Sequence, residues 1–210
     1  MSKTIPMSRR ITPFQLIIMG FAGVILLGAL VLMLPLSARS GTVTPFGDAL
    51  FTATSAVCVT GLVVQDTASY WSGFGQAVIL LLIQIGGLGV ITVAASFALL
   101  SGRKISLMQR SAMQEAIAAP QMGGIVRLTG FILRMTLTIE IIGALVMLPV
   151  FCHDYGARGV WMAVFHSISA FCNAGFDLMG TKEAPYVSLM GYASHPLINV
   201  TIMLLIVIGG

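Results

Sequence analysis

Long runs of apolar residues alternate with short polar stretches along the chain. Three of these runs, Phe14 to Leu34, Phe74 to Leu100 and Leu128 to Phe151, have the length of a membrane-spanning helix. About 20 consecutive apolar residues cross the hydrocarbon core of a bilayer. The pattern therefore predicts three spans, and a fourth apolar run begins at Leu197 and continues to Gly210.

Two shorter segments lie between these runs. The first, with Thr44 as the expected cap and Pro45 at the first helical position, has about ten residues before Cys58, or roughly 15 Å of helix. The second is Gly159 to Phe171. Neither is long enough to cross a membrane, and extended backbone at membrane depth is tolerated only along a water-filled path or inside protein. We therefore predict two re-entrant pore loops, at residues 45–66 and 159–177.

Both short segments carry the same motif, Ser-Ala-x-Cys-x-x-Gly. Five residues recur without a gap 114 positions later: Phe51, Ser55, Ala56, Cys58 and Gly61 become Phe165, Ser169, Ala170, Cys172 and Gly175. The glycine that ends each copy accepts the positive φ that a sharp return requires. The repeat predicts two units of span, half-helix, return and span, at residues 13–100 and 128–210, with the second unit cut short. A polar linker, 101–127, separates them.

Composition supports a membrane protein. Hydrophobic residues make up 57% of the 210 and charged residues only 9%, whereas a soluble domain carries about 25% charge. The net charge of +4 is too scattered for a phosphate-binding face, so we expect no nucleic-acid partner. A signal peptide has an apolar region of roughly 7–15 residues, so the longer first run is expected to be a retained span.

The charges also predict an orientation. With residues 1–12 in the cytoplasm, the cytoplasmic segments hold seven of the basic residues: Lys3, Arg9, Arg10, Arg103, Lys104, Arg110 and Arg127. The outer segments hold three, Arg39, Arg158 and Lys182. This bias is the positive-inside pattern. Five acidic residues gather on the outer side, where they would concentrate cations: Asp48, Asp66, Asp154, Asp177 and Glu183.

Polar groups inside the predicted spans are few. Glu140 lies deep in the third span, and a charge there is a functional hypothesis by default. Arg134 lies six positions earlier and does not share its helix face, so the partner of Glu140 is not apparent. Gln84 is interpreted as an interhelical polar group. The glycines from Gly86 to Gly89 indicate close helix packing more than a dinucleotide loop, which is a weak match here.

No arrangement typical of an enzyme is present. The three cysteines follow no metal spacing, and Cys58 and Cys172 occupy equivalent places in the repeats. We interpret them as small residues in tight backbone; Cys152 beside His153 is only a weak hint of a metal. The histidines and acids form no nucleophile–base spacing. We therefore predict no catalytic residues, no enzyme activity and no bound cofactor.

With these features together, the chain resembles the Trk/Ktr/HKT superfamily of potassium uptake proteins, and most closely the KtrB-type membrane subunits. Three segments carry the resemblance: Thr54-Ser-Ala-Val-Cys-Val-Thr-Gly-Leu62, Gln84-Ile-Gly-Gly-Leu-Gly-Val90 and His166-Ser-Ile-Ser-Ala-Phe-Cys-Asn-Ala-Gly-Phe-Asp177. The cytoplasmic Gly102-Arg-Lys-Ile-Ser106 also fits. The last of the three longer segments is the most specific.

This resemblance implies an all-α membrane protein with two of four parallel M1–P–M2 repeats of a potassium-channel-like fold. It implies potassium as the transported substrate, with backbone carbonyls along the two returns as the selectivity filter: Val59, Thr60, Gly61, Asn173, Ala174 and Gly175. It also implies a homodimer in the plasma membrane and cytoplasmic RCK-type, KtrA-like regulatory subunits. Sodium is the candidate activator.

Two further expectations come from the sequence. The final apolar run is short of a full span and ends in Ile208-Gly209-Gly210, which mirrors Ile85-Gly86-Gly87, so we expect the N-terminal half of a longer transporter that does not conduct alone. The competing function is an ion-coupled secondary transporter, because broken helices and internal repeats also mark those folds. Parallel repeats and few buried charges favour the pore.

Overall fold

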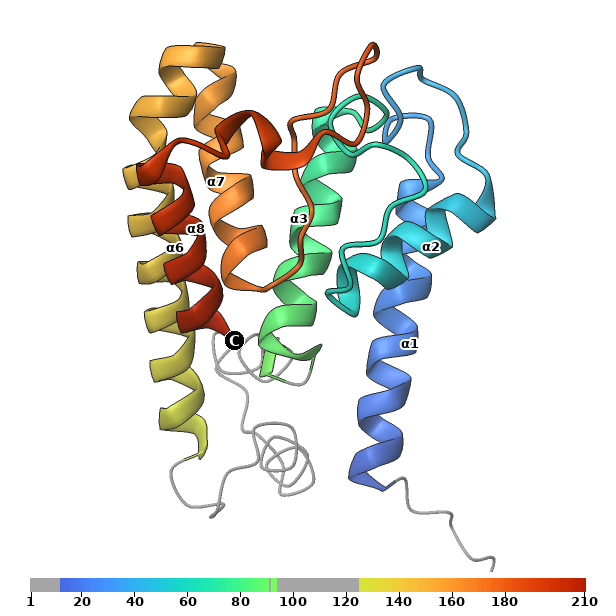
Figure 1. The fold of residues 1–210 in the computed structure, drawn as a ribbon. Helices are drawn as coiled ribbons and strands as arrows, with labels where there is room; N and C mark the ends of the chain where they lie inside the picture. The colour runs from blue at the N-terminus through green and yellow to red at the C-terminus, as the bar shows by residue number, and fades with distance from the viewer. Residues whose placement is uncertain (1–11, 91, 94–124) are drawn as a thin grey trace, which may run out of the picture.

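A computed structural model describes residues 12–90, 92–93 and 125–210, and these residues form helices joined by loops (Figure 1). No strand occurs among them; the one bridge in this part of the chain pairs Ala38 with Trp71. The predominantly helical architecture that the sequence predicts is confirmed. The N-terminal segment and most of the linker expected at 101–127 lie outside the described residues.

The first helix, α1, runs from Pro13 to Leu32. Thr12 and Gln15 form a capping box at its start, and proline at the first position needs no hydrogen-bond partner for its nitrogen. Phe14–Leu32 is one of two described segments that are long and apolar enough to cross a membrane; the other is Arg127–Tyr155. The helices α3, Gly73–Leu88, and α8, Pro196–Gly209, are shorter.

Two short helices enter partway along the long ones (Figure 1). They are α2, Phe46–Val57, and α7, Arg158–Phe171. The expected cap at Thr44 is wrong: Pro45 is the N-cap, without a side-chain bond. The backbone N–H of Thr44 donates to the Met33 carbonyl at 3.3 Å, which ties the loop before α2 to the end of α1.

The long helix α6 runs from Ile125 to Tyr155. It begins three residues before the expected start at Leu128 and ends four residues after the expected end at Phe151. Only Gly156 and Ala157 separate it from α7. A Cβ at Gly159 would overlap the Phe151 carbonyl oxygen, so glycine is needed where α7 turns back against α6.

Matching glycines fix the packing in both halves. A Cβ at Gly28 would lie 2.7 Å from Leu82, and one at Gly143 would lie 2.8 Å from Leu205. The helices α1 and α3, and likewise α6 and α8, therefore meet through a leucine packed against a glycine. The expectation that the Gly86–Gly89 cluster allows close packing is confirmed at Gly86, where a Cβ would overlap the Val57 carbonyl oxygen.

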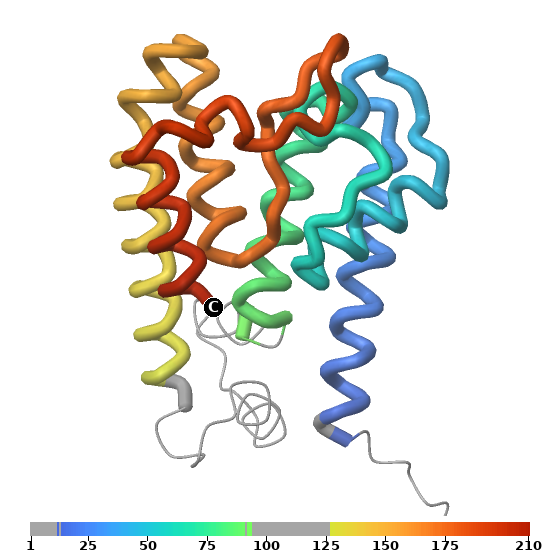
Figure 2. The backbone as a smooth tube through the Cα atoms, in the orientation of Figure 1, coloured from blue at the N-terminus to red at the C-terminus, as the bar shows by residue number. Residues whose placement is uncertain are grey.

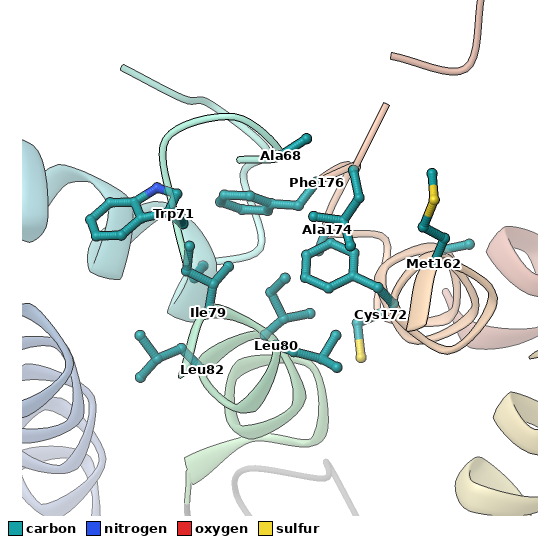
Figure 3. Close-up of a cluster of buried hydrophobic side chains, with 14 of the residues drawn as sticks. Ala68, Trp71, Ile79, Leu80, Leu82, Met162, Cys172, Ala174 and Phe176 are labelled. Atoms are coloured by element: carbon teal, nitrogen blue, oxygen red, sulfur yellow. The ribbon is translucent and has the colours of Figure 1, made fainter. Parts of the chain in front are cut away.

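The core lies between the two halves. Figure 3 shows Ala174 and Phe176, from the segment after α7, among side chains of α3 and α7 such as Leu80 and Met162. Ala174 and Phe176 are buried. This packing anchors the segment after α7 against the first half of the chain.

Candidate ion-path site

The segment after α2, which we call the first return, is residues 58–62. Two of its residues have positive φ, 52° at Val59 and 71° at Gly61. The amide of Thr60 donates to the Ser55 carbonyl at 3.0 Å, and that of Cys58 donates to the Thr54 carbonyl at 2.8 Å. These bonds tie the return to the last turn of α2.

The segment after α7, the second return, is residues 172–176. It has the same backbone, with φ of 57° at Asn173 and 74° at Gly175. The amide of Ala174 donates to the Ser169 carbonyl at 2.8 Å. Positive φ is uncommon for residues other than glycine, and here it falls on Val59 and Asn173, at equivalent positions of the sequence repeat.

The two returns face each other at the centre of the molecule (Figure 2). A Cβ at Gly61 would lie 2.6 Å from the Ala174 carbonyl oxygen and 3.4 Å from the Cα of Gly175. The structure thus brings together the backbones of the two predicted filter segments. Of the six predicted residues, Ala174 is buried, Val59 and Gly61 are partly buried, and the other three are exposed: Thr60, Asn173 and Gly175.

A repeated serine stands behind each return. The Ser55 and Thr60 hydroxyls share a hydrogen bond of 2.8 Å, and the Ser169 hydroxyl donates to the Phe176 carbonyl at 2.6 Å. Both serines are almost fully buried. Their recurrence in the Ser-Ala-x-Cys-x-x-Gly motif was a visible signal, although the sequence does not reveal their bonding partners.

Asp66 joins the loops that follow the two returns. Its carboxylate accepts from the Ser69 amide at 2.7 Å, the Ser69 hydroxyl at 2.7 Å and the Tyr186 amide at 2.9 Å. Gly180 lies directly against it, since a Cβ there would overlap the carboxylate. Sequence reasoning placed Asp66 only at the end of the first loop and missed this role.

Asp177 follows the second return and lies half-buried beside this junction. Burial raises the pKa of its carboxyl, the Met179 amide opposes that rise, and the Asp66 charge adds to it. The two acids therefore act on each other, and a cation near them would favour the ionised form of Asp177.

Gln76, near the start of α3, is a second junction that the sequence analysis missed. Its side-chain amide donates to the Thr67 carbonyl at 3.3 Å and the Trp71 carbonyl at 3.1 Å. Its oxygen accepts from the Trp161 indole at 2.9 Å. Since Trp161 belongs to α7, this residue connects the two halves through a buried amide; no motif in the sequence marks it.

His166 on α7 braces the second return. Its Nδ1 lies 2.7 Å from the Met162 carbonyl oxygen, and its Nε2 accepts from the Leu178 amide at 3.2 Å. The side chain is buried. A cavity of about 190 Å³ borders it, and Asn173, Gly175 and Asp177 also line this cavity.

Glu140 has a partner that the sequence did not reveal. The Gln84 side-chain amide donates to the Glu140 carboxylate at 2.9 Å, so the interpretation of Gln84 as an interhelical polar group is confirmed. The backbone carbonyl of Glu140 accepts from the Ser167 hydroxyl at 2.7 Å. Residues 12–90, 92–93 and 125–210 contain no group of three or more His, Cys, Asp or Glu side chains placed to hold a metal ion.

Comparison with known proteins identifies the family of the chain. The family model described as TrkH, cation transport protein, matches residues 4–210. The potassium/sodium uptake protein NtpJ of Enterococcus hirae is 42% identical over 96% of this chain. Ktr system potassium uptake protein B is 42% identical in Bacillus subtilis and 37% identical in Vibrio alginolyticus, over 96% and 93% of this chain.

The chain spans less than half the length of these relatives, at 44%, 44% and 42% of each. The match nevertheless covers nearly all of the chain, both returns included. The chain belongs to the TrkH family of cation transport proteins.

Proposed function

We propose that the chain forms part of a potassium-selective pore for uptake across the plasma membrane. One observation carries the proposal: two returns of matching backbone, each ending a short helix, meet at Gly61 and Gly175. Three relatives are named as potassium or potassium/sodium uptake proteins. The proposed filter consists of backbone carbonyls of Val59, Thr60, Gly61, Asn173, Ala174 and Gly175.

The backbone of the returns suits this role. Where neighbouring residues alternate between negative and positive φ, their N–H groups line up on one side of the chain. Their carbonyls then lie together on the other side. In the first return, positive φ occurs at Val59 and Gly61 but not at Thr60. Aligned carbonyls can replace the hydration shell of a cation without the full charge that would trap it.

The short helices would also attract a cation to the returns. The C-terminal ends of α2 and α7 lead directly into the returns, and a helix C-terminus carries partial negative charge. We propose that the two helices, at residues 46–57 and 158–171, are the pore helices of two M1–P–M2 repeats. The resemblance to four-repeat proteins implies that two further returns complete the ring.

Transport measurements test the proposal. In a host without its own potassium uptake, expression of the protein as its cell makes it should restore growth at low potassium and drive uptake of a rubidium tracer. Uptake should follow membrane potential without a coupled sodium or proton flux. Coupled flux of either ion would favour the secondary transporter, and no potassium or rubidium uptake would refute the pore.

The topology and partners are proposals of the same kind. We propose a cytoplasmic N-terminus, a homodimer and a regulatory ring of RCK-type subunits on the cytoplasmic side, with sodium as the candidate activator. The basic residues Arg103, Lys104 and Arg110 would contribute to the docking surface. Charge reversal at all three should reduce co-purification of the regulatory subunit, and undiminished co-purification would argue against this surface.

A further inference from the structure

We propose that His166 is a positioning residue that holds the second return in the geometry that selects potassium. This inference rests on the proposed function. His166 is bonded to the Leu178 amide, in the segment that follows Gly175, so its effect on the return would pass through the Leu178 backbone.

The hydrogen bonds define the protonation of the ring. The Met162 carbonyl can only accept, so the Nδ1 atom at 2.7 Å carries the proton. The Leu178 amide can only donate, so Nε2 at 3.2 Å carries none. His166 is therefore neutral and protonated on Nδ1, and the other tautomer would set two N–H groups against each other.

Two bonds hold the end of the second return to α7. Ser169 donates to the Phe176 carbonyl at 2.6 Å, and the Leu178 amide donates to His166. Phe176 and Leu178 are both buried. Since these residues come one and three positions after Gly175, their attachment fixes the direction in which the backbone leaves the proposed filter.

The first return lacks the equivalent brace. The position that corresponds to His166 is Thr52, whose hydroxyl donates to the Asp48 carbonyl within α2 at 2.8 Å. The position that corresponds to Ser169 is Ser55, which bonds the Thr60 hydroxyl. Neither side chain is bonded to residues 62–64. The first return is tied further on, where Gln65 donates to Asp48 at 3.0 Å.

The surroundings of His166 favour the neutral ring. Its ring centroid lies 5.3 Å from that of Phe151 and 6.1 Å from that of Phe165. Aromatic side chains exclude water, and burial disfavours a charged imidazole. The brace therefore depends on the acceptor at Nε2 and not on a charge.

Selectivity of matched variants tests the inference in the protein as its cell makes it. His166→Met fills similar space but has no acceptor at the position of Nε2. In His166→Gln the side-chain oxygen is as many bonds from the backbone as Nε2, so it can accept from the Leu178 amide. We expect His166→Met to lower the potassium-to-sodium permeability ratio by roughly fivefold, the size of one lost hydrogen bond. His166→Gln should retain most of it. Thr52→Val is the matched control in the first half and should leave the ratio unchanged.

An unchanged ratio in His166→Met, or an equal loss in His166→Gln, would overturn the role of the acceptor. If His166→Met does not reach the membrane, nitrogen NMR of the histidine-labelled protein decides, with His166→Gln assigning the signal. A ring protonated on Nδ1 supports the inference, and one protonated on Nε2 overturns it. Failure of the proposed function would be seen separately, as absence of potassium uptake by the unsubstituted protein.

Discussion

The Gln84 side chain of α3 donates a hydrogen bond to the Glu140 carboxylate of α6 at 2.9 Å. This pair links the two halves of the chain through polar groups inside apolar helices. Glu140 is only 4% exposed, and the Gln84 side-chain oxygen has no hydrogen-bond partner in the described part of the chain. A buried polar group that loses its partner carries a large desolvation cost.

Gln84→Leu should therefore lower the free energy of unfolding by about 1–3 kcal/mol, because Glu140 would remain buried without its donor. Replacing both residues by leucine should recover part of the loss. Thermal unfolding of the single and double variants in detergent measures the coupling. Strictly additive effects would mean that the two side chains do not interact energetically.

Gly61→Ser should reduce potassium selectivity and admit more sodium. The added Cβ would lie 2.6 Å from the Ala174 carbonyl oxygen, and φ is 71°. At Gly175 the nearest atom to a Cβ is 3.6 Å away, so Gly175→Ser should have a smaller effect. Permeability ratios for potassium and sodium measure both.

Gly47→Ser is the matched control for these variants, because a Cβ at this position in α2 meets nothing within 4 Å. It should leave the ratio unaltered. A wild-type ratio in Gly61→Ser would count against the first return as part of the filter.

A cysteine placed at Ser111 should be protected from an impermeant reagent added outside intact cells, whereas one at Ser40 should react. Ser40 is exposed in the loop after α1, and the positive-inside bias predicts that the basic linker lies in the cytoplasm. The measurement uses a background without Cys58 and Cys152. Labelling at Ser111 from outside would show that the linker faces outward and would contradict the proposed topology.

Asp177→Asn should change how stability depends on pH. Because burial raises the folded-state pKa of this carboxyl, its contribution to stability is fully present below the ordinary pKa. That contribution is lost as pH rises through the raised value. Relative to the unsubstituted protein, Asp177→Asn should therefore gain stability as pH rises from about 4, the ordinary pKa of an aspartate, through the raised pKa.

Thermal unfolding in potassium-free buffer, over a series of pH values from about 4 upward, measures this gain. Glu183→Gln, in an exposed part of the same loop, is the charge-matched control and should show no such gain. If stability depends on pH equally in Asp177→Asn and in the unsubstituted protein, the burial of Asp177 does not cause that dependence.

The repeated motif predicted where the two short helices end, because its information is local. A serine, a cysteine and a glycine at fixed spacing define where a helix stops and how the backbone turns, and the two returns do share positive φ at equivalent positions. α1 begins at Pro13, where the first unit was expected to begin; the cap at Thr12 was not predicted.

Contacts between distant segments could not be predicted in this way. Helical periodicity shows which residues share a face of one helix, so it excluded Arg134 as the partner of Glu140 but could not identify Gln84. The end of α6 was missed for a related reason. The predicted span ended at Phe151, whereas α6 continues to Tyr155. The Tyr192 hydroxyl, far along the chain, donates to Asp154 at 2.5 Å in this last turn.

The backbone contact between Gly86 and the Val57 carbonyl has a counterpart in the second half, where Gly209 lies against the Phe171 carbonyl. Backbone against backbone leaves no side chain to act as a compliant spacer. Each short helix is therefore mechanically part of the helix behind it. A tilt of α3 or α8 would therefore displace the neighbouring return.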